Sequence, residues 1–232
     1  MSWTMYSLDG QRKYLTRSET RRFLETASAG DAESRAFCWL LAVTGCRISE
    51  ALALTVDQVD FEAKTIAFEC LKKRRRSVFR SIPVPDAVLD QLAAIVRARE
   101  LSGSDRFWPW SRMTGYRRVR EIMEDVGLKG PQASPKGLRH GFGVGAIQAG
   151  VPLNLVQRWL GHADMKTTAI YTSAMGPEER GIAARMRGET FSLGAKPRGG
   201  ARNLAAGLRI SVEMPQESGL RHGSRIRYTR QV

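Results

Sequence analysis

The chain has 232 residues, of which 42% are hydrophobic and 26% are charged. This length gives room for one ordinary domain or two small ones, with a sizeable core, and the composition argues against a wholly disordered chain or a membrane protein. Its 37 Lys and Arg residues outnumber 23 Asp and Glu residues, which gives a formal net charge of +14. We therefore expect a polyanionic partner, with nucleic acid first among the candidates.

The cysteines and the N-terminus indicate a cytoplasmic protein. Cys38, Cys46 and Cys70 are odd in number and widely spaced, which is typical of buried free thiols in a reducing compartment and not of a disulfide framework or a metal cluster. Residues 1–20 hold no apolar signal segment, and no later window approaches 18 uninterrupted apolar residues. Secretion and a membrane location are both disfavoured.

The first third of the chain has the pattern of three helices. Residues 16–19 read Thr-Arg-Ser-Glu, a capping box that predicts a helix start, and Ser-Ala-Gly at 28–30 predicts its end. Dense apolar residues predict a buried helix over about 32–44. Gly45 then marks a turn before a short helix that carries Ile48 and Leu52.

The middle of the chain has the pattern of a basic hairpin followed by two helices. Residues 65–69 and 78–84 are β-branched and alternating, which predicts two antiparallel strands. A helix is predicted from Pro85-Asp86 to about Arg99, and a basic helix follows around Arg117. Five consecutive cations lie between the two predicted strands: Lys72, Lys73, Arg74, Arg75 and Arg76.

The last third begins with clear helix signals and ends without them. Ser134 as N-cap and Pro135 at the first position predict a helix over 135–149. A second helix over about 152–160 is ended by Gly161, and short helices are predicted over 166–172 and 178–187. The predicted organisation is an N-terminal lead-in (1–15), a mainly α domain with a small antiparallel β-sheet (α+β; 16–187), and a flexible, basic, Gly/Arg-rich tail (188–232).

Four sequence boxes, in this order and at this spacing, resemble the catalytic domain of the tyrosine recombinases, or phage integrase family. They are Thr-Gly-Cys-Arg-Ile-Ser-Glu-Ala-Leu at 44–52, Lys-Gly-Leu-Arg-His at 136–140, Leu-Gly-His at 160–162 and Thr-Thr-Ala-Ile-Tyr at 167–171. A hairpin lysine after Cys70-Leu71 adds to them, and the match covers residues 14–187. The resemblance implies the fold of that catalytic domain and a site-specific recombinase or integrase acting on double-stranded DNA.

The implied reaction is attack on a DNA phosphodiester by the hydroxyl of Tyr171, which gives a 3′-phosphotyrosyl intermediate and a free 5′-hydroxyl. No metal or cofactor is needed, because the covalent bond conserves the phosphoester energy. Arg47 and Arg139 match the pair whose guanidinium groups hold the phosphate oxygens and their developing charge. His162 matches the residue that hydrogen-bonds the scissile phosphate and supports proton transfer.

Further residues take supporting parts in this resemblance. Lys136 stands where most members have histidine, and a lysine stabilises phosphate charge but is a poor general base, so the acceptor of the tyrosine proton stays open. Lys72 is the first choice and Lys73 the second for the general acid that protonates the leaving 5′-oxygen. Glu50 and His140 are expected to support the site. The remaining hairpin cations are expected to contact DNA: Lys73, Arg74, Arg75, Arg76 and Arg80.

The resemblance also implies partners. We expect a homo-tetramer on DNA. About 15 residues precede the first predicted catalytic-domain helix, which leaves three alternatives: a fragment, a minimal recombinase, or a DNA-clamping domain or accessory protein supplied by another chain. Integration or excision of a mobile element is the implied setting. The alternatives are a catalytically silent or accessory DNA-binding protein and an enzyme like a type IB topoisomerase.

Overall fold

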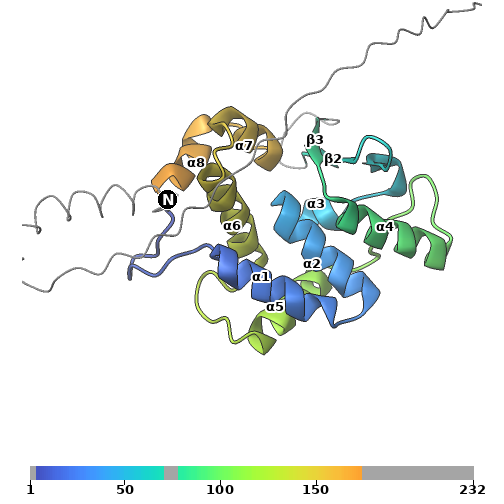
Figure 1. Cartoon of the computed structure of the whole chain (residues 1–232), viewed down its shortest axis with the longest axis horizontal. Coiled ribbons are helices and arrows are strands. Elements are labelled where there is room, and N and C mark those ends of the chain that lie inside the picture. The colour runs from blue at the N-terminus through green and yellow to red at the C-terminus, as the bar shows by residue number, and fades with distance from the viewer. Residues whose placement is uncertain (1–3, 71–77, 174–232) are drawn as a thin grey trace, which may run out of the picture. The chain divides into compact units, whose positions relative to one another are not determined.

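The computed structural model describes residues 4–70 and 78–173, and it has a mainly α fold with one small antiparallel sheet. This confirms the predicted fold class. Figure 1 shows the long helix α6 between α7 and α8 on one side and α2 on the other. The elements are α1 (Arg17–Ser28), α2 (Ala32–Thr44), α3 (Ile48–Leu52), η1 (Val56–Gln58), β1 (Val59–Asp60), β2 (Thr65–Glu69), β3 (Phe79–Pro83), α4 (Asp86–Arg99), α5 (Arg112–Asp125), α6 (Pro135–Gln148), α7 (Leu153–Leu160), α8 (Met165–Ala169) and η2 (Ile170–Ser173).

Local signals set most of the helix ends. Thr16 caps α1 with the predicted capping box to Glu19, and Ser134 caps α6 with Pro135 in its first turn. Two helices end on left-handed glycines, α2 at Gly45 and α7 at Gly161. These are positions where a side chain would be strained. The predicted helix over 178–187 and the tail over 188–232 lie outside the described residues.

The sheet has the order β1-β2-β3, with both pairs antiparallel. The two longer strands were predicted, whereas the two-residue strand β1 was not. Ile66 of β2 pairs with Val59 on one side and Ile82 on the other, and all three side chains are buried. Along β3 buried and exposed residues alternate, so Arg80 points to the same buried side as Ile82.

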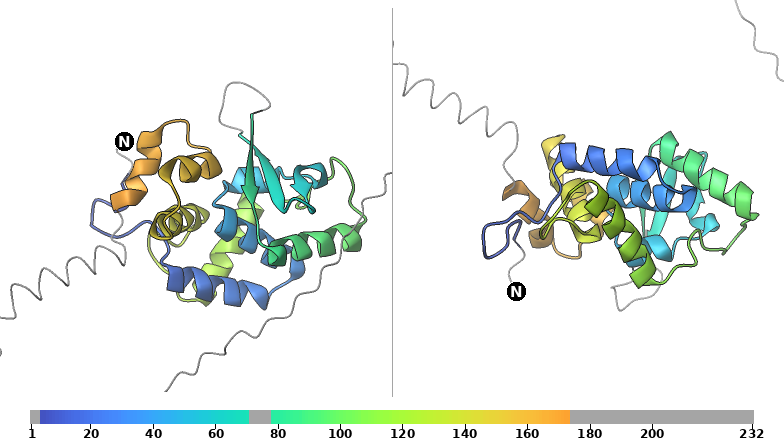
Figure 2. Two further views of the ribbon diagram at one scale, coloured as in Figure 1. Left: turned by 45° about the horizontal axis from the view of Figure 1, so that its top comes forward. Right: turned by 90° about the horizontal axis from the view of Figure 1, so that it is seen from below.

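The hydrophobic core consists of two clusters. The larger one joins α1, α2, α4, α5 and the sheet, with Phe37, Phe68 and Trp108 among its fully buried side chains. The smaller one joins the second half of α6, α7, η2 and the N-terminal segment, and it includes Tyr171. Helix α6 belongs to both clusters, because Leu138 packs in the first and Val144 in the second. The two views of Figure 2 show α6 in this central position.

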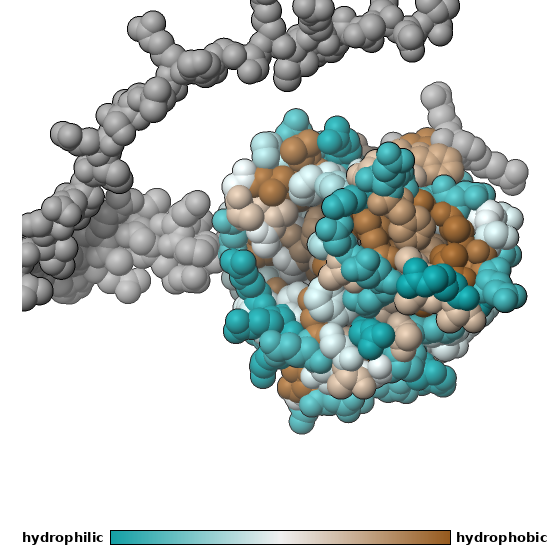
Figure 3. All heavy atoms as spheres, turned by 45° about the vertical axis from the view of Figure 1, so that its right-hand side comes forward, coloured by the Kyte–Doolittle hydropathy of each residue, from teal (hydrophilic) through white to brown (hydrophobic). Residues whose placement is uncertain are grey.

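The surface is mixed in polarity. On the face shown in Figure 3, hydrophobic residues gather in one area and hydrophilic residues surround it. No helix in the described part of the chain is long and apolar enough to cross a membrane.

Candidate active site

Arg47 is placed by a tight turn between α2 and α3. Gly45 adopts φ +60°, and a Cβ there would lie 2.6 Å from the Phe142 ring, so the turn requires glycine. Arg47 is then the N-cap of α3. Its backbone N–H donates to Glu50 Oε2 (2.8 Å) and its Nη1 to Glu50 Oε1 (2.6 Å). The side chain keeps 23% of its surface exposed, so the guanidinium group is fixed by Glu50 and still open to a ligand.

Glu50 is a buried carboxylate shared by two arginines. It is 3% exposed, and its Oε2 also accepts a hydrogen bond from Arg80 Nη2 (2.6 Å). Burial opposes ionisation, but the hydrogen bond and charge of Arg80, with those of Arg47, outweigh it and hold the pKa of Glu50 below its ordinary value. Glu50 therefore remains charged and holds Arg47 in one orientation.

Arg80 does not lie on the surface, contrary to its predicted role as a DNA contact. It is 6% exposed, and its donors bind Glu50, the Trp159 carbonyl (2.7 Å from Nε) and Cys70 Sγ (3.4 Å from Nη1). The physical reason is the alternation of β3, which turns position 80 toward the core. We correct its role to a buried ion-pair partner that ties β3 to α3 and to the end of α7.

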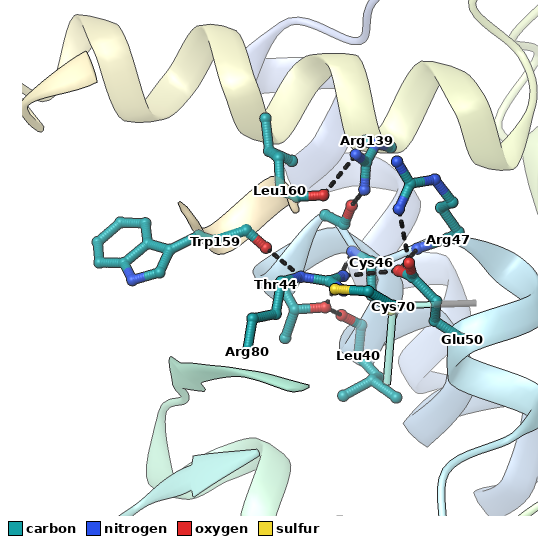
Figure 4. Close-up of polar contacts among 11 residues, drawn as sticks. Leu40, Thr44, Cys46, Arg47, Glu50, Cys70, Arg80, Arg139, Trp159 and Leu160 are labelled. Atoms are coloured by element: carbon teal, nitrogen blue, oxygen red, sulfur yellow. Dashed lines mark hydrogen bonds and ion pairs between the residues drawn. The ribbon is translucent and has the colours of Figure 1, made fainter. Parts of the chain in front are cut away.

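Arg139 ties α6 to the same region. Its Nη1 donates to the Gly45 carbonyl (2.7 Å) and its Nη2 to the Leu160 carbonyl (2.6 Å). Figure 4 shows Arg47, Arg80 and Arg139 gathered near Glu50 and the last carbonyls of α7. Burial, reinforced by repulsion from Arg47, lowers the pKa of Arg139 to about 10, so the group stays charged at neutral pH. Three close guanidinium groups with a single carboxylate among them leave an excess of positive charge, which favours the arrival of an anion.

Tyr171 lies in η2 and packs against α6. It is 1% exposed, and its hydroxyl is 3.2 Å from Nδ1 of His140, which is itself 2% exposed. A Cβ on Gly143 would lie 2.7 Å from the tyrosine ring, so α6 leaves room for the ring only because position 143 is glycine. Burial raises the pKa of Tyr171 to about 12, although Arg139 and Arg47 act in the opposite direction. The phenol is therefore neutral at pH 7.

His162 directly follows the left-handed Gly161 that ends α7. Its Nδ1 lies 3.0 Å from Oγ1 of Thr168, a fully buried residue of α8, and its ring is nearly parallel to that of Tyr171 (17°, centroids 6.1 Å apart). Burial, followed by repulsion from Arg139 and Arg47, lowers the pKa of His162 to about 3. A pocket between β3 and α7 has His162, Arg80 and Phe79 in its wall.

The structure thus brings together most of the predicted site residues that it describes. Arg47, Arg139, His162, Tyr171, Glu50 and His140 converge from α3, α6, η2 and the end of α7. Lys136 lies exposed in the first turn of α6. Five residues with predicted roles lie outside the described residues: Lys72, Lys73, Arg74, Arg75 and Arg76.

Sequence reasoning missed two supporting residues. Thr168 holds His162, and Gly143 makes room for Tyr171. Thr168 lies three residues before Tyr171, within the same short sequence box, and that proximity to the tyrosine was the signal that could have pointed to it. Gly143 is one of four glycines between 137 and 145, an unusual density for a helix interior that signals close packing.

Comparison with known proteins agrees with this geometry. The model of the phage integrase family matches residues 13–176, and the chain belongs to this family. Tyrosine recombinase XerA of Pyrococcus furiosus is 29% identical over 166 residues, covering 69% of this chain and 57% of that protein. Tyrosine recombinase XerD of Caulobacter vibrioides is 34% identical over 182 residues, covering 71% and 58%. The chain thus spans somewhat more than half the length of these relatives.

Solved structures share the fold. A XerH site-specific recombinase bound to its palindromic difH substrate has a TM-score of 0.67 and 25% identity, over 75% of this chain and 53% of that one. The catalytic domain of bacteriophage HP1 integrase has a TM-score of 0.53 and 20% identity, over 76% of this chain and 96% of that domain. The second likeness shows that the described fold is that of an integrase catalytic domain.

Proposed function

We propose that this chain is the catalytic part of a site-specific DNA recombinase, which cuts and rejoins double-stranded DNA one strand at a time through Tyr171. The observation that carries the proposal is the convergence of one phenol, two guanidinium groups and one imidazole from four separate elements. The tyrosine recombinases among its relatives support it, as does a structural neighbour, a XerH site-specific recombinase bound to its difH substrate. The net charge of +14 also supports it.

Each group has a physical role in the proposed reaction. Arg47 and Arg139 hold the non-bridging phosphate oxygens and stabilise the charge that develops on them as Tyr171 Oη attacks. His162 donates a hydrogen bond to the same phosphate, with Thr168 fixing the other side of its ring. A hairpin lysine, Lys72 first and Lys73 second, protonates the departing 5′-oxygen. Lys136 adds positive charge near the phosphate.

The burial of Tyr171 adds a condition to this mechanism. A phenol that is 1% exposed cannot meet a phosphodiester until binding of DNA opens a path to its hydroxyl.

We propose that the chain acts as a homo-tetramer in integration or excision of a mobile element, in the cytoplasm, with any DNA-clamping domain or accessory protein outside the described residues.

The test is formation of a covalent DNA adduct. A duplex selected by this protein from a random-sequence pool is nicked beside the selected site, so that the cleaved end diffuses away and the adduct accumulates on a denaturing gel. We expect an adduct with the wild-type chain and with Tyr116→Phe, a control at a partly exposed tyrosine of α5, and none with Tyr171→Phe. Binding without an adduct would favour a silent DNA-binding protein, and plasmid relaxation without exchange would favour a topoisomerase.

A second prediction separates catalysis from affinity. Arg47→Ala should lower the rate of adduct formation by about 10²–10³-fold, because it removes one donor to the transition-state charge. DNA affinity should change little, since one cation among a large basic excess adds a single salt-sensitive contact. Arg21→Ala, at an exposed arginine of α1, should leave both quantities unchanged. A parallel loss of binding and cleavage in Arg47→Ala would contradict the assigned role.

A further inference from the structure

The acceptor of the Tyr171 proton is the unassigned part of the proposed mechanism. A phenol that attacks phosphorus must release its proton, and a lysine at position 136 carries an ammonium group with no lone pair to receive it. Within residues 4–70 and 78–173, His140 Nδ1 is the hydrogen-bond partner of the Tyr171 hydroxyl, at 3.2 Å. This distance is within the range from which a general base acts.

The surroundings fix this contact. His140 is 2% exposed and directly follows Arg139 on α6. The Arg139 side chain is anchored by hydrogen bonds to the carbonyls of Gly45 and Leu160. One turn further along the helix, Gly143 lets the tyrosine ring lie directly against the backbone of α6. The imidazole and the phenol are therefore held by packing on the same helix that supplies one of the phosphate ligands.

His162 is placed less well for this proton transfer. Its Nδ1 is engaged by Thr168 at 3.0 Å, and its ring faces the flat side of Tyr171 with the centroids 6.1 Å apart. Its position suits a hydrogen bond to the phosphate instead. The two histidines thus contact the phenol differently, His140 at its hydroxyl and His162 at the face of its ring.

Burial and nearby cations keep His140 in the neutral form, which has a lone pair for a proton, and they also make it a weaker base until they are offset. Burial is the main cause that lowers its pKa to about 4, and the charges of Lys136 and Arg139 on its own helix and of Lys13 from the N-terminal segment act in the same direction. Tyr171 faces His140 from η2, and His162 lies near enough to His140 for the charge of His140 to affect its pKa. A bound phosphate beside Arg139 would offset these cations and make protonation of His140 easier.

We propose that His140 is a catalytic residue that accepts the Tyr171 proton at Nδ1, an inference that depends on the proposed function. As the Oη–P bond forms, the Oη–H bond breaks and its proton passes to Nδ1, while the P–O5′ bond breaks and the 5′-oxygen takes a proton from the hairpin lysine. In the rejoining step each proton returns: His140 protonates the departing phenolate, and the lysine accepts the proton of the attacking 5′-hydroxyl.

The first test is the pH dependence of single-turnover cleavage on the selected nicked duplex. His140→Gln retains a polar side chain but cannot accept a proton, so its rate at pH 7 should fall by about 10²–10⁴-fold. Its rate should then rise about tenfold per pH unit up to pH 9, because a phenolate formed by hydroxide needs no acceptor. An equal loss at every pH would mean a packing role and would overturn the proposal.

The outcomes separate this proposal from the function on which it depends. Absence of an adduct with the wild-type chain on DNA that it binds would overturn the proposed recombinase function itself. An adduct with wild type, together with full activity of His140→Gln at pH 7, would overturn the role of His140 alone.

A second test needs no substrate and no variant. The ¹⁵N chemical shifts of the His140 ring in the wild-type chain report which nitrogen carries the proton. We expect the proton on Nε2 and a lone pair on Nδ1, with a titration midpoint well below the ordinary value for histidine. A ring that carries its proton on Nδ1, and so donates to Tyr171, would overturn the proposal.

Discussion

At the scale of residues, the candidate site depends on charges that are buried and paired. Glu50 holds Arg47 with one oxygen and Arg80 with the other, while Arg80 and Arg139 bind successive carbonyls at the end of α7. Each guanidinium group thus fixes a neighbouring element as well as contributing charge. The side chains that we propose to position a phosphate therefore also stabilise the fold.

The pair of Glu50 and Arg80 gives a stability prediction. Arg80→Met should reduce the free energy of unfolding by about 3 kcal/mol, because it removes the main partner of a buried carboxylate. The double variant Glu50→Gln/Arg80→Met should lose less unfolding free energy than Arg80→Met alone, because a neutral glutamine does not need Arg80 as a partner. Chemical denaturation of the wild type, the two single variants and the double variant measures this, and additive losses would contradict the coupling.

The two histidines of the site, one buried and one partly buried, give a pH prediction. Burial lowers the pKa values of His140 to about 4 and of His162 to about 3, whereas an unfolded histidine titrates near 6.5. Between pH 6.5 and about 4 the unfolded chain therefore binds more protons, and stability falls on acidification by up to about 1.4 kcal/mol per pH unit for each histidine. Above pH 6.5 this contribution is fully present.

Denaturation curves at pH 7.0, 6.0 and 5.0 check this dependence. The double variant His140→Gln/His162→Gln should show a clearly flatter profile than wild type across that window, whatever its absolute stability. A wild-type profile without a slope there would mean that the histidines are protonated in the folded state.

At the scale of elements, α6 is the helix on which the site is built. Its first half carries Lys136, Arg139 and His140, and its second half offers the glycine surface that receives Tyr171. It packs in both core clusters, which explains how residues of the larger cluster and the tyrosine of the smaller one meet at its centre.

Two glycines of α6 form a matched pair for a test of this role. Gly143→Ala places a Cβ 2.7 Å from the ring of Tyr171 and must displace it, so adduct formation should fall by at least about tenfold. Gly145→Ala meets nothing within 4 Å and should raise stability by about 0.5–1 kcal/mol with activity retained. Thermal unfolding and the adduct assay measure both. Retained activity in Gly143→Ala would contradict the observed packing.

The same elements show what the sequence could predict. Capping signals at Thr16, Ser134 and Gly161 are local, and they predicted helix ends close to those observed. The strand β1 was missed because two residues carry no recognisable period. The role of Arg80 was predicted from its charge and not from its position two residues before Ile82 on the buried side of β3. Its partners, Glu50 and the Trp159 carbonyl, are distant in sequence.

At the scale of the whole molecule, the family boxes predicted which residues gather, but not how they contact one another. The contacts of His140 with Tyr171, and of Thr168 with His162, depend on how α6, α7 and η2 pack together. Such packing is a tertiary property, which a pattern along the chain does not contain. The net charge of +14 indicates a polyanionic partner. The residues of the candidate site are the basis for the reaction that we propose on that partner.

The most direct test of the central claim is the identity of the residue bound to DNA. The trapped adduct is digested with nuclease and protease, and the modified peptide is sequenced by mass spectrometry. We expect a 3′-nucleotide attached through its phosphate to the Tyr171 side chain. A nucleotide on any other residue, or attachment through a 5′-phosphate, would contradict it.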